Sequence, residues 1–228
     1  MRSAVKTYGL VAFLIPILLV GIRLVNAQEK THQGFFISVQ AGPAFGSING
    51  FTPTGEKLHI TGTGSGFDLL IGGAVNQHLI VHGTLSSKMG SGPSINDMDC
   101  SECILVDESF MGGGITWYLK NNFLVSASVG AGNFSLSNDK ENLAYLFYGS
   151  LPEICDEPYT SFETTDGLSI QFKAGKEWWV SPTWALGILL EYGRTMVNQP
   201  FDDSSIGPWS SNRFSIRFSA TRNGRKNK

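Results

Sequence analysis

Three cysteines carry the sharpest local chemistry in this 228-residue chain. Cys100 and Cys103 form a Cys-x-x-Cys pair, and Cys155 follows about fifty residues later. We expect no zinc site, because four ligands are needed and the two segments that hold these thiols contain no histidine. A redox Cys-x-x-Cys motif would need a βαβ context, which is absent. We predict a disulfide that joins Cys155 to Cys100 or to Cys103, with the choice open and one thiol left over.

A second candidate set consists of polar residues on one face of a predicted strand. His82, Thr84 and Ser86 alternate along residues 78–86, and Glu191 lies on a later strand with the same orientation. Some membrane enzymes that modify lipid A use a histidine, a serine and an acid, so this set defines an enzyme hypothesis. No motif joins the residues, however, and we predict a packed polar group. We therefore assign no catalytic residue, no cofactor and no metal site.

Acidic residues are concentrated outside the predicted strands. An acidic surface of this kind attracts divalent cations that bridge to lipopolysaccharide, or a cationic partner. A solvated surface without a ligand is the simpler interpretation. Fifteen of the 19 acidic residues belong to this group: Glu56, Asp97, Asp99, Glu102, Asp107, Glu108, Asp139, Glu141, Glu153, Asp156, Glu157, Glu163, Asp166, Asp202 and Asp203.

The N-terminus has the organisation of a secretory signal peptide. Arg2 and Lys6 precede an apolar run over residues 8–22, and the segment ends at Ala27 after small residues that suit signal peptidase. The run is shorter than the roughly 20 apolar residues that span a bilayer, and Arg23 interrupts it. We predict cleavage after residue 27, which removes three basic residues and changes the net charge from −2 to −5. Such a chain has no basic patch for nucleic acid.

The rest of the chain alternates between apolar and polar residues with a period of two, which is the signature of β-strands. Gly is abundant at 27 residues, and charged residues make up only 16%. No apolar run after residue 27 is long enough for a membrane helix. The alternation predicts eight strands, at residues 34–46, 65–75, 78–86, 110–119, 123–134, 168–180, 184–194 and 213–221.

The connections between these strands alternate in length. Tight turns are predicted at residues 76–77, 120–122 and 181–183, and long loops at about 47–64, 87–109, 135–167 and 195–212. Short turns at one end and long loops at the other are typical of outer-membrane barrels. We therefore predict an all-β fold, an eight-stranded antiparallel up-and-down transmembrane β-barrel. Residues 28–228 form this single domain, and its four long loops are extracellular.

The polar face of the strands indicates which side of the barrel faces inward. It consists mainly of Gly, Ser, Thr and Ala, which suit a narrow lumen that only side chains fill. The isolated charges on it are expected to pair across the lumen, because a buried unpaired charge is costly. This predicted lumen network contains Asp68, Lys173, Glu177, Glu191 and Arg217. A soluble lipocalin-like barrel, with an apolar interior and a charged exterior, is the less favoured alternative.

Aromatic residues gather beside the predicted short turns. Trp117, Trp178, Trp179 and Trp184 are expected to form an interfacial girdle at the membrane surface. With the segment GKEWWVSPTWALGILLEYG at residues 175–193, these features resemble the small outer-membrane barrels of the OmpA/OmpX-like class. The resemblance covers about residues 34–221. It departs at the end, where Arg222 begins a basic tail in place of a terminal aromatic residue.

The function that follows is a non-catalytic one. We predict a structural or surface-display barrel of adhesion type in the outer membrane, with its function in the long acidic loops. The expected surroundings are outer-membrane lipid and lipopolysaccharide, with divalent cations or a surface partner at the loops, no nucleic acid and a monomeric state. The alternatives are a membrane-embedded lipid A-modifying enzyme and, less favoured, a soluble periplasmic ligand-binding barrel.

Overall fold

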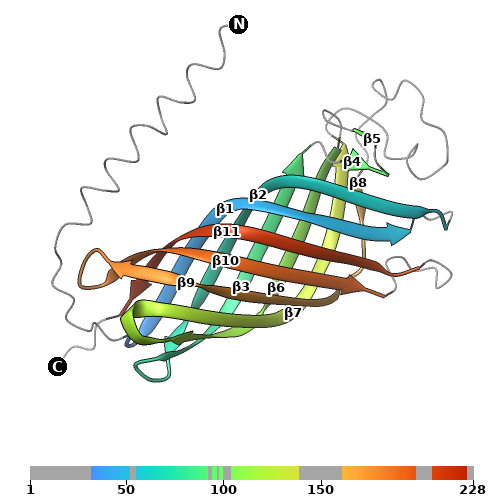
Figure 1. The fold of residues 1–228 in the computed structure, drawn as a ribbon. Coiled ribbons are helices and arrows are strands. Elements are labelled where there is room, and N and C mark those ends of the chain that lie inside the picture. The colour runs from blue at the N-terminus through green and yellow to red at the C-terminus, as the bar shows by residue number, and fades with distance from the viewer. Residues whose placement is uncertain are drawn as a thin grey trace, which may run out of the picture.

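The computed structural model describes residues 32–51, 55–91, 94–96, 98–99, 104–138, 161–198 and 207–224. Antiparallel strands dominate these residues and curl into one barrel (Figure 1). The long strands are β1 (Phe35–Phe51), β2 (Lys57–Ala74), β3 (Leu79–Ser91), β6 (Ile104–Tyr118), β7 (Phe123–Asn138), β9 (Gly167–Trp179), β10 (Trp184–Val197) and β11 (Trp209–Asn223). Short strands β4 (Ser94–Ile95), β5 (Met98–Asp99) and β8 (Ser161–Glu163) and the 3₁₀ turn η1 (Lys120–Asn122) complete the elements.

The barrel is closed by its first and last strands. The order β1-β11-β10-β9-β7-β6-β3-β2 returns to β1, because β1 pairs with β11 and also with β2. Neighbouring strands are antiparallel throughout this circuit. The predicted eight-stranded up-and-down barrel is thus confirmed. No helix in the described part of the chain is long and apolar enough to cross a membrane. The predicted signal peptide lies outside the described residues.

The three tight turns form where the sequence predicted them, and short polar side chains stabilise two of them. The Asn76 carboxamide oxygen accepts hydrogen bonds from the backbone N–H groups of His78 (2.8 Å) and Leu79 (2.9 Å). The Ser181 hydroxyl accepts one from the Trp184 N–H at 2.9 Å. In η1, Asn121 takes a positive φ of 60°, a conformation that asparagine adopts more readily than most residues.

The strands run beyond their predicted ends at the opposite end of the barrel. The predicted loop 47–64 is wrong, because β1 and β2 continue until only residues 52–56 connect them. The predicted loops 87–109, 135–167 and 195–212 shorten in the same way, to residues 92–103, 139–166 and 198–208, and the first two still contain β4, β5 and β8. Both termini of the described chain lie at the short-turn end, which is the periplasmic end of such barrels.

The lower part of the barrel, next to the short turns, has an apolar exterior, and its interior contains most of the buried polar and charged side chains together with an apolar cluster that includes Phe36 and Leu70. Outward side chains such as Ile71, Leu190 and Phe218 are 45%, 64% and 56% exposed, whereas inward Asp68 and Gln171 are buried. A water-soluble barrel has the opposite arrangement, so this wall is one that faces lipid. We call this part the membrane half. Its upper edge is marked on the eight strands by outward residues Phe45, Phe67, Leu85, Met111, Ala131, Leu168, Tyr192 and Phe214.

Above that edge the polarity inverts. Most outward positions become polar, as at Ser47 and Asn49 on β1 and at His59 and Thr61 on β2, although Met89 and Leu105 remain apolar and exposed. The interior becomes an apolar core of buried side chains: Ile48, Leu58, Ile60, Ile95, Val106, Phe134, Leu136, Val197 and Trp209. We call this part the extracellular half. At roughly 3.3 Å of rise per residue along a tilted strand, it extends the barrel on the order of 10–20 Å above the apolar belt.

Candidate functional site: a charge-filled lumen beneath a polar rim

Five charged side chains meet at the centre of the lumen. Lys173 Nζ lies 3.0 Å from Asp68 Oδ2 and 3.5 Å from Glu191 Oε2. Arg217 Nε lies 2.9 Å from Asp68 Oδ2 and 3.0 Å from Glu191 Oε2, and Lys88 Nζ is 3.0 Å from Glu191 Oε1. All five are buried. Three cations therefore surround two carboxylates, each held by more than one partner. This arrangement is what offsets the desolvation of buried charge.

Four of the five predicted network residues belong to this central cluster. Asp68, Lys173, Glu191 and Arg217 come together from strands β2, β9, β10 and β11. Space for the guanidinium depends on a glycine, since a Cβ at Gly66 would lie 2.0 Å from Arg217 Nη1. Sequence analysis missed Lys88, because that residue fell in the predicted loop 87–109. Strand alternation continued by two residues beyond Ser86 would have placed it inward.

A second ion pair lies above the cluster. Glu108 on β6 is buried and pairs with Arg213 on β11. It also accepts hydrogen bonds from the hydroxyl groups of Thr195 (2.7 Å) and Ser211 (3.0 Å). The prediction that Glu108 is a loop acid was therefore wrong. Its neighbour Asp107 does face outward and accepts a hydrogen bond from Ser87 at 2.9 Å.

Glu177 does not join the central cluster, contrary to the prediction. It lies nearer the periplasmic end and accepts hydrogen bonds from the hydroxyl groups of Thr221 (2.6 Å), Tyr118 (2.9 Å) and Ser219 (3.2 Å). No ion pair among the described residues includes Glu177. The sequence showed its inward orientation but not its height along the axis, which strand register determines.

His82 sits in a network of hydroxyl groups. Its Nδ1 lies 3.0 Å from Thr84 Oγ1, and its Nε2 lies 3.0 Å from Thr116 Oγ1. Thr116 in turn donates to Ser126 at 2.9 Å. Within the described chain, no hydrogen bond connects His82 with Ser86 or Glu191, whose carboxylate is engaged by the three cations. The proposed His–Ser–acid set is therefore not assembled in this arrangement.

The periplasmic mouth is closed by the segment that precedes β1. The His32 ring stacks on Tyr118 with 3.4 Å between ring centroids, and its Nδ1 lies 2.9 Å from Asn223 Oδ1. The side chain is buried, with only 2% exposed. Burial disfavours the charged imidazolium and lowers the pKa of His32 from 6.5 to about 4. At neutral pH, the buried His32 ring is therefore uncharged.

Three of the four predicted girdle tryptophans face outward at the periplasmic end. Trp117, Trp178 and Trp184 are 47%, 47% and 43% exposed. Trp179 was wrongly included. It follows Trp178 directly, so strand alternation turns it inward, where its ring lies 5.2 Å from that of His32. Outward Lys176 lies over the Phe123 ring, with its Nζ 4.7 Å from the ring centroid.

The predicted cysteine chemistry lies outside the described residues, since Cys100, Cys103 and Cys155 all fall in segments that the structure does not describe. Within the described part, no three His, Cys, Asp or Glu residues group together as metal ligands. The lumen beside Arg213 contains a cavity of about 20 Å³, which has room for about one water molecule. Polar and charged side chains thus fill the middle of the lumen, an apolar cluster that includes Phe36, Leu70 and Leu189 fills its periplasmic end, and the apolar core around Trp209 fills its extracellular end.

Comparison with known proteins finds similarity of fold only. No family model matches the chain, and no curated protein matches it. Among solved structures, it is similar to Ail, the attachment invasion locus protein of Yersinia pestis, at 12% identity and a TM-score of 0.42 over 83% of this chain and 99% of that one. It is also similar to Neisserial surface protein A, at 10% identity and a TM-score of 0.45 over 82% and 97%.

A third similar structure is the outer membrane protein OprG from Pseudomonas aeruginosa, at 9% identity and a TM-score of 0.46 over 86% of this chain and 99% of that one. At these identities the likeness concerns the fold alone. The assignment to the outer membrane rests on the barrel itself. An apolar belt surrounds a filled lumen with many polar side chains, and short turns at one end alternate with longer connections at the other. The protein is a small outer-membrane β-barrel.

Proposed function

We propose that this protein is a non-catalytic surface-display barrel, in which the membrane half is an anchor and the extracellular half is a platform for binding. The observation that carries this proposal is the inversion of polarity within single strands. A barrel that served only as a membrane anchor would end at its apolar belt. Here the strands continue into a part with its own apolar core, which includes Phe134, Leu136 and Trp209, and with a polar outer surface.

A filled lumen argues against a transport function. Eight strands leave space only for side chains. The central cluster around Glu191 and the ion pair of Glu108 with Arg213 lie across that space as successive layers. Passage of a solute would require these buried pairs to separate, and breaking one buried pair already costs about 3–5 kcal/mol.

The enzyme alternative has less support. The Glu191 carboxylate forms ion pairs with three cations. Both ring nitrogens of His82 are within hydrogen-bond distance of threonine hydroxyl groups. A general base has to be positioned against a nucleophile and exposed to its substrate. His82 is 3% exposed and faces the lumen, whereas lipid A is outside the wall.

The partner we propose is cationic. Outward Asp107 and Glu163 are acidic groups at the base of connections that hold further acids, including Glu153, Asp156 and Glu157. This acidic surface would attract divalent cations that bridge to lipopolysaccharide phosphates, or a basic region of a surface partner. We propose that a single barrel in the outer membrane presents it.

The test compares whole cells that express the protein with cells that express a variant in which residues 140–159 are replaced by a short Gly-Ser linker. We expect the variant to keep its folded gel mobility before heating and to lose most binding of fluorescent oligolysine. His82→Ala should bind oligolysine like the wild type. Mass spectrometry of lipid A should show no change in acylation with either protein. An acylation change that disappears with His82→Ala would contradict the proposal and favour the enzyme.

A further inference from the structure

The aromatic residues at the upper edge of the apolar belt are missing from three adjacent strands of the barrel. Tyr192, Phe214, Phe45 and Phe67 lie on the adjacent strands β10, β11, β1 and β2, and the Tyr192 and Phe214 rings are 5.1 Å apart. On β3, β6 and β7 the corresponding outward residues are aliphatic: Leu85, Met111 and Ala131. On β9 the direct partner of Tyr192 is the exposed aromatic residue Phe172, and Leu168 lies further toward the extracellular side. Interfacial aromatics usually surround the whole barrel, so one side of this wall lacks its girdle.

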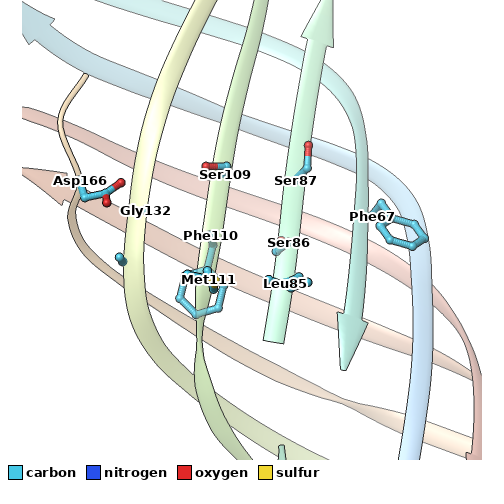
Figure 2. Close-up of a pocket in the computed structure, with 10 residues that line it drawn as sticks. Phe67, Leu85, Ser86, Ser87, Ser109, Phe110, Met111, Gly132 and Asp166 are labelled. Atoms are coloured by element: carbon cyan, nitrogen blue, oxygen red, sulfur yellow. The ribbon is translucent and has the colours of Figure 1, made fainter. Parts of the chain in front are cut away.

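A groove of about 380 Å³ lies over β3, β6 and β7, with Phe67 of β2 at one end (Figure 2). The outward residues that line the groove form two rows of register partners on neighbouring strands. Leu85, Met111 and Ala131 are direct neighbours across β3, β6 and β7 and form the apolar row. One step toward the extracellular side, Ser87 and Ser109 are neighbours and form a polar row. The volume is in the range of small-molecule sites. An apolar floor under a polar rim is what an amphiphile requires.

Below the groove, toward the membrane centre, two outward positions of the wall have no side chain. Gly83 and Gly113 are opposite each other on β3 and β6 and face outward. A Cβ at Gly83 or Gly113 would have no neighbour closer than 3.8 Å or 3.9 Å, so nothing within the barrel requires glycine there. By contrast, a Cβ at inward Gly112 would lie 2.3 Å from the Val129 carbonyl oxygen. Glycine inside a strand often marks a place where a ligand approaches the backbone.

The rim of the groove is acidic. Asp166 stands at the end opposite Phe67 (Figure 2), two residues after Thr164, whose hydroxyl accepts a hydrogen bond from the Phe134 N–H at 3.0 Å. None of the ion pairs found in the described part of the chain includes Asp166. Glu163 lies close by and accepts a hydrogen bond from Asn133 at 2.8 Å. Because Asp166 is exposed, its carboxylate can accept a hydrogen bond from a cationic head group that enters the groove.

We propose that this groove is a binding site for one hydrocarbon chain that carries a cationic, amine-type head group. The chain lies over Ala131 and continues along the bare Gly83–Gly113 pair, and the head group meets Asp166 and the serine row. A second copy of the barrel fits less well, because a two-fold contact would bring two acidic rims together, and like charges repel. The inference is independent of what the extracellular connections bind.

The test uses the full-length mature barrel in phosphatidylcholine vesicles that contain a small fraction of a hexadecylamine with a photoreactive diazirine in its chain. Mass spectrometry of the labelled peptides maps where the chain resides. We expect label to concentrate on β3, β6 and β7. Unlabelled hexadecylamine should displace it, whereas hexadecanoate should not. Uniform labelling of all eight strands would mean ordinary annular lipid and would overturn the proposal, as would cross-links between two copies at these strands.

Two variants and one control make the result specific. Ala131→Phe fills the groove with a side chain that lipid tolerates, and it should abolish the preferential labelling while the folded gel mobility persists. Ala174→Phe makes the same change at an exposed position of β9 and should leave the labelling unchanged. Asp166→Asn keeps the shape, and competition by the amine should become about fivefold weaker, the effect of losing one exposed charge pair. Unchanged labelling in Ala131→Phe would contradict the site.

Discussion

The membrane half and the extracellular half are built from the same strands in the same alternation, yet their polarity is opposite. On β2, Leu58 and Ile60 point inward and His59 and Thr61 point outward. Ten residues later Asp68 points inward and Leu69 and Ile71 point outward. The backbone geometry does not change between these segments, since one continuous ladder with β1 holds both. The medium around the barrel therefore decides whether the outward face of a strand is apolar, whereas the interior of the membrane half combines the charged cluster with apolar residues such as Leu70.

The largest effect is expected when the charge balance of the membrane half is broken. Glu191→Gln leaves Asp68 alone with Lys88, Lys173 and Arg217, and should lower the free energy of unfolding by about 3–5 kcal/mol. The urea midpoint of unfolding in lipid vesicles measures the loss. Lys88→Met removes one of the three cations, so the double variant Glu191→Gln/Lys88→Met should recover part of the lost stability. A double variant with the summed loss of both single variants would show that the charges act independently.

The cost of a charge placed on the outer surface should be large in the membrane half and small in the extracellular half. Ile188→Arg puts a cation on the lipid-facing wall near the membrane midplane and should cost about 2–4 kcal/mol, whereas Leu69→Arg, one outward step below the upper edge at Phe67, should cost less. Asn49→Arg puts the same cation on the outward face of the extracellular half, where water solvates it, and should have little effect. The fraction that migrates as folded barrel before heating reports both. Equal tolerance at Ile188 and Asn49 would contradict the location of the belt.

Acid should act on the membrane half and not on the apolar core above it, which contains no ionisable group. The folded state holds His32 neutral with a pKa of about 4, whereas the unfolded chain protonates it near 6.5. Between these values the unfolded state binds more protons, so stability falls as the pH decreases from 6.5 toward 4, by at most about 1.4 kcal/mol per pH unit. Urea midpoints at pH 7.5 and 5.5 measure this change.

His32→Gln is the control for the pH effect. It removes the titrating ring, while other groups in the lumen remain in both proteins. The difference in midpoint between pH 7.5 and 5.5 should therefore be smaller for His32→Gln than for the wild type. The same difference in both proteins would show that His32 does not close the periplasmic mouth in the folded state.

The smallest effect concerns packing. Ile48→Val removes one methylene from the apolar core of the extracellular half, and the resulting cavity should cost about 0.5–1.5 kcal/mol. Ile115→Val makes the same deletion on the lipid-facing wall, where the side chain is 49% exposed. Lipid fills the space there, so the change should be smaller. A larger loss at Ile115 than at Ile48, measured by urea midpoint, would argue against a packed extracellular core.

The sequence predicted the barrel, its turns and most of the central cluster, because alternation alone assigns each side chain to one face. Asp68, Lys173, Glu191 and Arg217 were found in this way. Alternation did not predict the inversion, since apolar Ile48, Leu58 and Val106 follow the opposite phase from the lipid-facing residues and fall within the predicted loops. Lys88 and Glu108 were missed for the same reason. Heights along the axis depend on register between strands far apart in sequence, so the separation of Glu177 from Glu191 could not be anticipated.

The inversion also constrains how the protein is assembled. The polar outer face of the extracellular half, with Asn49, His59 and Thr61, must pass from one side of the bilayer to the other before the barrel is complete. Polar groups without partners are costly in hydrocarbon. Translocation of this half as a finished wall would expose that face to lipid. Each hairpin tip must therefore cross through a hydrated passage, and the apolar core can close only after the last tip has emerged.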